Sequence, residues 1–268
     1  MKVIFHNDDF GLTWGFTEAT YQLGIKGKIN SLSIRTNGVD FFRARKLSKA
    51  LAKKGVRIGI HLNITDGPTC QDRLANNQGH YKYSFLHYLL LLLFPNHKLE
   101  RLITNEFEQQ FHMLKGVGII QVDSHDHIHL IPRIFRITCQ FCQKHHLKYI
   151  RLIKEPFLIV NKKNIHPFSY AKHLLLNLFS NLNRKVAQDY DLISVDSFYG
   201  VLYTNQMDSK VISASLKHAS SKGYQTIQIL SHPTLINNSH DIIYTSRFIQ
   251  KYANLPNRKV EYESLLKF

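Results

Sequence analysis

Short apolar runs alternate with longer segments of helical periodicity along most of the chain. The apolar runs predict seven strands, at residues 3–5, 31–36, 56–62, 119–122, 149–152, 192–195 and 225–230. The segments between them predict helices at residues 13–24, 41–54, 99–115, 132–146, 211–222 and 244–252, before a short segment at 259–262. Strands that alternate with helices indicate βαβ units and a parallel sheet. About seven such strands predict an α/β, barrel-like fold.

Two stretches interrupt this alternation. Residues 66–97 follow the third predicted strand and form an insertion with a leucine-rich tract at 85–94, which is predicted to be a buried helix. The tract is too short to span a bilayer, which needs about 20 apolar residues. The stretch between the fifth and sixth predicted strands is rich in Asn, Lys and His, and it predicts no regular element up to 192–195.

Composition adds limits on domain count, compartment and partners. No linker or change in composition divides the chain, so residues 1–268 are predicted to form a single domain. The N-terminus does not resemble a secretory signal and the three cysteines cannot all pair, which favours a reducing, cytoplasmic compartment. The net charge of +16 favours anionic partners, but the basic residues are scattered. Without a recognisable nucleic-acid-binding motif, this charge does not predict binding to nucleic acid.

Polar clusters fall at the C-terminal ends of the predicted strands. Asp8 and Asp9 follow the first strand, and His61 lies near the end of the otherwise apolar third strand. In α/β barrels, active sites are assembled at this end from different loops. Taken alone, the Asp pair would also suit a solvated turn, because short motifs carry a high risk of false matches. A single histidine on an apolar strand would also suit a hydrogen-bonded place in the core.

A third cluster favours chemistry over these alternatives. Asp123, His125, His127 and His129 occupy alternate positions, so an extended segment would project them to one side. So many ionisable groups are costly to desolvate unless they hold a metal, a substrate or one another. A carboxylate and two imidazoles from three strand ends would leave positions open for water and substrate. Such a site can activate water and polarise a carbonyl.

Short motifs then give the chain a specific resemblance. In order, they are HNDDFGL (6–12), SLS (31–33), TNG (36–38), GIHLNITDG (59–67), VDSHDHIHLIP (122–132), IRL (150–152) and SHP (231–233). In their combination and order, which span almost the whole chain, the sequence resembles the YdjC-like carbohydrate deacetylases, the family of chitooligosaccharide deacetylase. The resemblance implies a (β/α) barrel-like domain related to polysaccharide deacetylases. It also implies hydrolysis of a linear amide, with removal of the N-acetyl group from an amino sugar.

The resemblance also implies roles for individual residues. The metal ligands, with Mg²⁺ or Zn²⁺ as the usual ion, are matched by Asp9, His61 and His125. Asp8 matches the catalytic base, and His232 matches the general acid. Arg151 matches an arginine that would keep Asp8 ionised and oriented. Positions around the ligands and the substrate are matched by Asn37, Asp126, His127 and Gln228.

Two departures from the family pattern leave alternatives open. The family usually carries a glutamate four residues before the late histidine, whereas this chain has Gln228, which could orient His232 but not charge it. Thr234 replaces a usual glycine. A catalytically impaired carbohydrate-binding protein is therefore an alternative hypothesis. A deacylase of another amide or ester is a second one, because the metal chemistry does not select the leaving group. A lipid-linked glycan, an anionic membrane surface reached through the leucine-rich tract, and a homodimer are hypotheses for substrate and partners.

Overall fold

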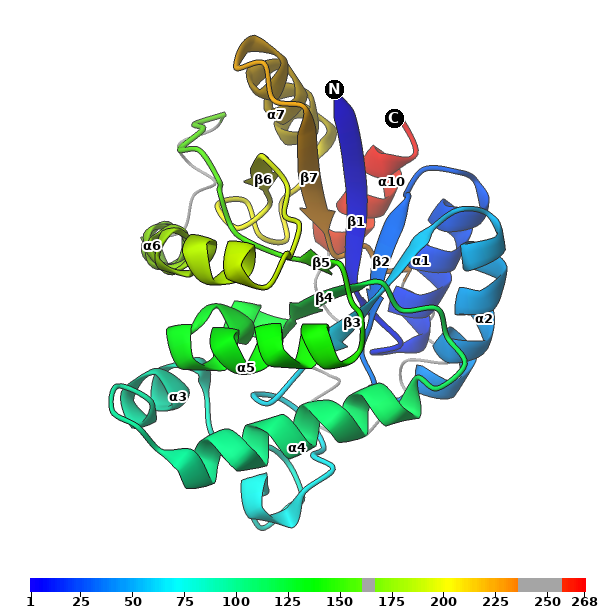
Figure 1. The fold of residues 1–268 in the computed structure, drawn as a ribbon. Helices are drawn as coiled ribbons and strands as arrows, with labels where there is room; N and C mark the ends of the chain where they lie inside the picture. Colours follow the sequence, from blue (N-terminus) through cyan, green and yellow to red (C-terminus); the bar gives the residue numbers. More distant parts are fainter. Residues whose placement is uncertain (161–166, 236–256) are drawn as a thin grey trace.

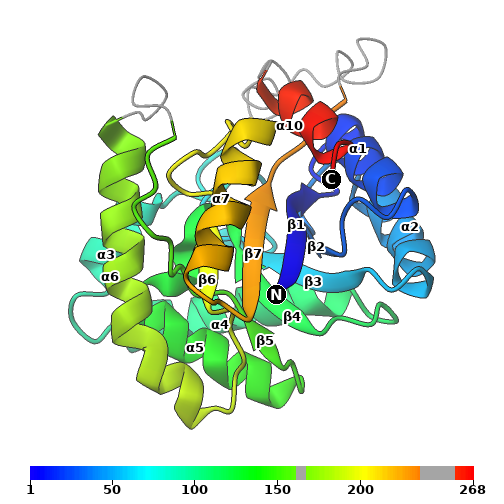
Figure 2. The same ribbon diagram turned by 90° about the horizontal axis from the view of Figure 1, so that it is seen from above.

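The strands of the molecule form one parallel sheet. The computed structural model describes residues 1–160, 167–235 and 257–268. Seven strands pair in the order β5-β4-β3-β2-β1-β7-β6, and the sheet curls into a half-barrel (Figure 1, Figure 2). They are β1 (Lys2–Phe10), β2 (Ser31–Ile34), β3 (Arg57–Leu62), β4 (Gln121–Ser124), β5 (Tyr149–Ile150), β6 (Ser197–Tyr199) and β7 (Thr226–Ser231). The prediction of an α/β fold with about seven parallel strands is confirmed.

Helices surround the curled sheet on its outer side (Figure 2). They are α1 (Trp14–Ile25), α2 (Phe41–Lys53), α3 (Phe85–Leu91), α4 (His97–Met113), α5 (Pro132–Lys144), α6 (Pro167–Asp189), α7 (Ser209–Ser221) and α10 (Asn257–Leu265). Two short 3₁₀ segments are η1 (Asp72–Leu74) and η2 (His125–Leu130). Because all the strands run in one direction, their C-terminal ends meet at one edge of the sheet, where the loops of a barrel fold build a site.

The two faces of the sheet differ in polarity because side chains alternate along each strand. On the outer face, Leu32 and Ile58 are paired neighbours and are buried in the main apolar core. On the concave face, the Gln121 amide donates to Ser31 Oγ at 2.8 Å. Gly59 makes room for this amide, since a Cβ there would lie 2.5 Å from Gln121 Cγ. The concave face of the half-barrel therefore carries polar side chains, in contrast to the apolar outer face.

The stretch without a predicted element contains α6, a helix of 23 residues. Leu176 and Phe179 of α6 are buried, whereas Leu174 and Leu178 are more than half exposed. Apolar side chains thus lie on both the core side and the solvent side of α6. This distribution hides the amphipathic period on which sequence reasoning depends.

Three other predictions differ from the structure or fall outside it. The sixth strand is β6, and the predicted strand at 192–195 contributes instead an isolated bridge from Ile193 to Tyr149. The short segment at 259–262 lies inside α10. The helix predicted at 244–252 lies outside the described residues.

The leucine-rich tract is helical, but the prediction that it is buried is wrong. Tyr88 and Leu92 are buried, whereas Leu86 is 60% exposed and Phe94 is 78% exposed. The tract begins at α3, in the segment that connects β3 to α4. None of the helices that the structure describes has both the length and the apolarity needed for a membrane span.

Candidate metal centre

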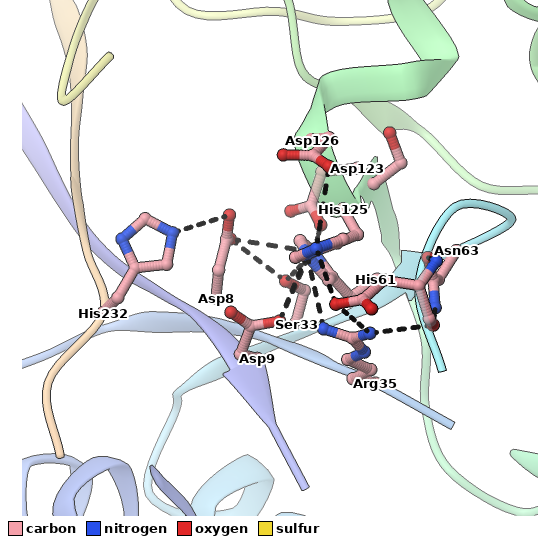
Figure 3. Close-up of polar contacts among 12 residues, drawn as sticks. Asp8, Asp9, Ser33, Arg35, His61, Asn63, Asp123, His125, Asp126 and His232 are labelled. Carbon is pink, nitrogen blue, oxygen red and sulfur yellow. Dashed lines mark hydrogen bonds and ion pairs between the residues drawn. The ribbon is translucent and has the colours of Figure 1, made fainter. Parts of the chain in front are cut away.

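Asp8 and Asp9, at the end of β1, both line one cavity of about 330 Å³ (Figure 3). Consecutive strand residues normally point to opposite faces. Here Asp9 has a left-handed backbone, with φ 61°, and the pairing of β1 with β2 is irregular between Asn7 and Phe10. A bulge of this kind redirects a side chain, and strained backbone often occurs at functional sites. The bulge therefore allows β1 to deliver two adjacent carboxylates to the same cavity.

Asp9, His61 and His125 converge from the ends of β1, β3 and β4. His61 Nε2 and His125 Nδ1 each lie 3.6 Å from Asp9 Oδ1. Ligand atoms about 2.1 Å from a tetrahedral ion are about 3.4 Å apart, so small shifts would bring these three atoms into coordination distance. The residues matched to the metal ligands are therefore close enough to fit a divalent ion.

Asp123 orients the imidazole of His61. His61 Nδ1 lies 2.6 Å from Asp123 Oδ1, which leaves Nε2 facing Asp9. A carboxylate behind a ligating imidazole fixes its tautomer and increases its basicity. Burial lowers the pKa of His61, but the charge of Asp8 and the hydrogen bond to Asp123 outweigh burial and raise this pKa above its ordinary value. The sequence groups Asp123 with the histidines but does not predict this role.

Arg151 holds Asp8 with two hydrogen bonds. Arg151 Nη1 donates to Asp8 Oδ2 at 2.8 Å, and Nη2 donates to Oδ1 at 2.7 Å and to Asp123 Oδ2 at 2.7 Å. Ser33 Oγ also donates to Asp8 Oδ1 at 3.2 Å. Burial raises the pKa of Asp8, but Arg151 and then His61 outweigh it and hold this pKa well below its usual range. Asp8 is therefore a carboxylate at neutral pH.

A second set of donor atoms, from His6, Asp8 and Asp123, also lies close enough to surround an ion. The guanidinium of Arg151 already binds both carboxylates of this set. A metal ion there would face an adjacent positive charge that cannot be removed by deprotonation. A guanidinium also contacts Asp9, but through a single contact of 3.2 Å from Arg35, whereas Arg151 makes three hydrogen bonds of 2.7–2.8 Å to the second set. The cluster of Asp9, His61 and His125 is therefore the better metal site of the two.

Arg35, which follows β2, is a charged neighbour of the ligands that the sequence analysis does not predict. Its buried guanidinium Nη1 lies 3.2 Å from Asp9 Oδ1 and 3.4 Å from His125 Nδ1. Asn37 accepts from Arg35 Nε at 3.0 Å and donates to Asp66 O at 2.9 Å, so Asn37 supports Arg35 from behind. The charge of Arg35 stabilises the Asp9 carboxylate and opposes a nearby cation. A buried-strand pattern of alternating serine and aliphatic residues that runs directly into an arginine is the sequence signal for it.

The chain turns sharply after β4, so the prediction of an extended segment with three histidines on one side is wrong. Asp126 and His127 have left-handed backbones, with φ 53° and 58°, inside η2. As a result, His129 turns into the core, where its Nε2 lies 2.9 Å from the carbonyl oxygen of Arg151. Burial lowers the pKa of His129 to about 4. The ring of His129 is therefore neutral and has a place in the core, away from the cavity.

His127 and Asp126 remain at the cavity. His127 is buried in its wall, and its Nδ1 has no hydrogen-bond partner among the residues that the structure describes. Burial and the charge of Lys172 hold the pKa of His127 well below its ordinary value, so the ring is neutral. Asp126 lies at the rim, 3.4 Å from Lys172 Nζ. His127 therefore contributes a neutral ring to the cavity wall, with its Nδ1 buried.

His232 lies beside Asp8, away from the ligand cluster (Figure 3). Its Nε2 is 3.7 Å from Asp8 Oδ2, and its backbone N–H donates to Glu261 of α10 at 2.7 Å. Burial lowers the pKa of His232 to about 4, against the opposing charge of Asp8. The amide oxygen of Gln228 can accept from Arg151 Nη2 at 3.2 Å. Position 228 is therefore connected to Asp8 through Arg151.

Glu155 is a buried acid that the sequence analysis also misses. It accepts hydrogen bonds from the backbone N–H groups of Gly200 at 2.6 Å, Val201 at 3.1 Å and Leu202 at 3.0 Å. Burial raises the pKa of Glu155 to about 7, although these hydrogen bonds favour its ionised form. The loop that Glu155 holds leads to Thr204, which lines the metal cavity.

The fold and the site together define a parallel α/β half-barrel with buried carboxylates and imidazoles at the C-terminal edge of its sheet. The family model described as YdjC-like protein matches residues 2–267. The chain therefore belongs to the YdjC-like family, as the motifs of the sequence indicate.

Named relatives are carbohydrate deacetylases. The chitooligosaccharide deacetylase of Proteus mirabilis (strain HI4320) is 25% identical over 240 residues, which are 88% of this chain and 82% of that protein. A carbohydrate deacetylase of Halalkalibacterium halodurans is 32% identical over 154 residues, 55% of this chain and 62% of that protein. A crystal structure from Enterococcus faecalis V583, of a protein provisionally assigned to cellobiose-phosphate cleavage, has a TM-score of 0.69 and 19% identity. The match covers 98% of this chain and 90% of that one, and it shows the shared fold.

Proposed function

We propose that this chain is a metal-dependent hydrolase that removes N-acetyl groups from amino sugars. The observation that carries the proposal is the convergence of three ligand side chains, Asp9, His61 and His125, beside a separate ionised carboxylate, Asp8. Relatives named as carbohydrate deacetylases support an acetylated carbohydrate as the substrate class.

The ligand set indicates which ion would serve. A bound divalent ion would supply Lewis-acid chemistry, lowering the pKa of a water molecule and polarising the acetyl carbonyl. Two imidazoles and one carboxylate favour Zn²⁺ over Mg²⁺, because magnesium prefers oxygen ligands. Asp123 holds His61 in the tautomer that presents Nε2 to the ligand cluster.

Asp8 and His232 would share the proton transfers. Asp8, kept ionised by Arg151, would accept the proton of the attacking water. His232 is neutral at pH 7, so it must receive a proton before it can donate one to the departing amine. Asp8 Oδ2 lies 3.7 Å from His232 Nε2 and is a nearby source for that proton. This relay needs no carboxylate at position 228.

Arg35 favours one alternative function, the binding of an acetylated sugar without turnover. Its positive charge lies next to Asp9 and His125, where it would weaken the affinity for a divalent ion. A half-barrel that keeps its cavity but loses its ion could still bind a sugar through polar groups such as His127. Metal content and turnover must therefore be measured separately.

The test is acetate release from di-N-acetylchitobiose by the full chain, with and without added Zn²⁺ or Mg²⁺. The variants are Asp8→Asn and His125→Ala. Both should abolish turnover, because one removes the proton acceptor and the other a ligand. His125→Ala alone should strongly weaken metal retention, measured by metal analysis after dialysis. Thermal unfolding of each variant checks that it remains folded.

Three outcomes would separate the two functions. Turnover that requires metal and disappears in both variants supports the deacetylase. Sugar binding with no acetate release under any metal condition supports the binding protein. Equal acetate release by the wild type and both variants would overturn the site assignment.

A further inference from the structure

A second cavity lies next to the metal cavity, between α3 and α6. We call it the α3–α6 groove; it has a volume of about 400 Å³. Its walls are mostly apolar and include Phe85, Leu86 and Leu89 on one side and Leu175 on the other. Figure 2 shows α3 and α6 at the same flank of the molecule. The groove is therefore a lined apolar cavity between two helices.

The groove and the metal cavity share a wall. Asp126 and Lys172 line both cavities, and their side chains form an ion pair with Nζ 3.4 Å from Oδ1. The side chain of Asp126 is 44% exposed and that of Lys172 is 24% exposed. An ion pair this accessible to water contributes little to stability, so it can open or move aside at low cost. A single ligand could therefore extend from one cavity into the other.

The outer wall of the groove continues into an exposed apolar surface. Leu86 and Leu90 of α3 are 60% and 58% exposed, and Leu93 and Phe94 beyond it are 59% and 78% exposed. A contiguous apolar surface on a water-soluble domain usually marks a binding site. Scattered single leucines would need no such explanation, but these four residues lie within nine consecutive positions beside a cavity.

We infer that the α3–α6 groove is a subsite for the hydrocarbon chain of an amphiphilic substrate, an N-acetylated amino sugar that carries an alkyl or prenyl aglycone. The inference rests on the proposed function, because the sugar would occupy the metal cavity. Polar groups line the metal cavity, an ion pair forms the boundary, and apolar side chains line the groove. The same order of polarity occurs along a glycolipid, from its sugar through its linkage to its hydrocarbon tail.

The test compares two ligands that differ in their aglycone. Methyl and octyl glycosides of N-acetylglucosamine, at monomeric concentrations, are titrated calorimetrically into Asp8→Asn protein with Zn²⁺, so that hydrolysis does not interfere. The octyl compound should bind about tenfold more tightly or better, since each fully buried methylene contributes roughly a fourfold gain in affinity. Octanol is the third ligand, and it should bind more weakly than the octyl glycoside.

Two leucines of α3 offer a matched pair of variants. Leu86 lines the groove and Leu90 does not, although the two are almost equally exposed. Leu86→Asp, in the Asp8→Asn background, should bring the octyl and methyl dissociation constants to within about twofold of each other. Leu90→Asp, in the same background, should keep the tighter binding of the octyl glycoside that the Asp8→Asn protein shows. If circular dichroism shows that Leu86→Asp is unfolded, Ala171→Trp takes its place, because Ala171 is an exposed wall residue of α6.

The outcomes distinguish this inference from the proposed function. Equal affinity for the methyl and octyl glycosides, or an equal loss of preference in both leucine variants, would overturn the groove as a subsite. Octanol binding as tightly as the octyl glycoside would show that the groove holds free lipid and would also overturn the inference. Acetate release from di-N-acetylchitobiose, measured separately, stands or fails independently of all these results.

Discussion

Two regions of the molecule reverse the usual distribution of side chains. At the C-terminal edge of the sheet, charged groups such as Asp8 and Arg151 are buried, whereas at the α3–α6 groove leucines such as Leu86 are exposed. The buried charges are balanced within the chain, because Arg151 binds two carboxylates and Asp123 binds His61. The leucines of α3 have no comparable cover from the described residues.

This difference distinguishes a preformed site from one that needs its ligand. Buried charges tolerate the low-dielectric interior only when each has a partner, so the charged region must be complete when the chain folds. Exposed apolar groups cost free energy in water but do not prevent folding. The chain can therefore leave the groove open until a substrate covers it.

Arg151→Met should give the largest effect and tests whether the charged region is balanced as a unit. It leaves Asp8 and Asp123 buried without their shared cation, which should reduce the free energy of unfolding by about 3–5 kcal/mol. Denaturation in urea measures the loss. Leu90→Ser, in the apolar region, is the comparison and should change stability by less than about 0.5 kcal/mol. Similar losses in the two variants would contradict the contrast between the regions.

Glu155 should make stability depend on pH. Burial raises its pKa to about 7 in the folded chain from an ordinary value of 4.5, so the folded state binds a proton more tightly than the unfolded state does. The resulting stability is present below pH 4.5 and is lost as pH rises through 7, by about 3 kcal/mol in total. Glu155→Gln mimics the protonated side chain and should lack this loss. Urea denaturation of both proteins from pH 5 to 8 measures this loss. A difference in the free energy of unfolding between the two proteins that stays constant over this pH range would contradict the prediction.

The fold and much of the charged region can be predicted from the sequence, and the reason is physical. Alternation of apolar strands with helices defines a parallel sheet, and such a sheet brings its strand ends to one edge. The polar clusters that contain Asp9, His61 and His125 are therefore predicted to meet at that edge, and the family resemblance implies that these three residues are the metal ligands. The seven parallel strands confirm the fold, and one donor atom from each of these three side chains lies within 4.8 Å of the others.

What the sequence does not give depends on backbone turns and on surface exposure. The left-handed residues Asp9 and Asp126 redirect the chain in a way that no hydrophobic pattern records. Arg35 reaches the ligands because its long side chain folds back from the end of β2. The exposure of Leu86 and the helix α6 are not predicted for a related reason. A prediction from hydrophobic periodicity assumes that apolar residues face the core.

Arg35→Met tests whether the positive charge of Arg35 weakens the affinity of the charged region for a divalent ion. Removing the guanidinium next to Asp9 and His125 should lower the dissociation constant for Zn²⁺ by about tenfold or more, because a repulsive charge is lost. Competition with a chelating dye measures this constant without any need for turnover. Arg35→Lys keeps a positive charge and should resemble the wild type. Weaker Zn²⁺ binding in Arg35→Met would mean that Arg35 positions Asp9 more than it repels the ion.

Gln228→Glu should have the smallest effect, and it tests whether the charged region is already complete. The amide of Gln228 lies against Arg151, which binds Asp8 and Asp123, so a carboxylate at 228 would become a third acid on the same guanidinium. The Asp8 pKa would rise but stay below neutrality, and kcat/KM for acetate release at pH 7 should change by less than about threefold. Gln228→Ala, which removes the contact without adding charge, should also stay within this range. A gain of about a hundredfold in Gln228→Glu alone would show instead that the wild-type chain lacks an essential acid, and it would favour the sugar-binding protein over the deacetylase.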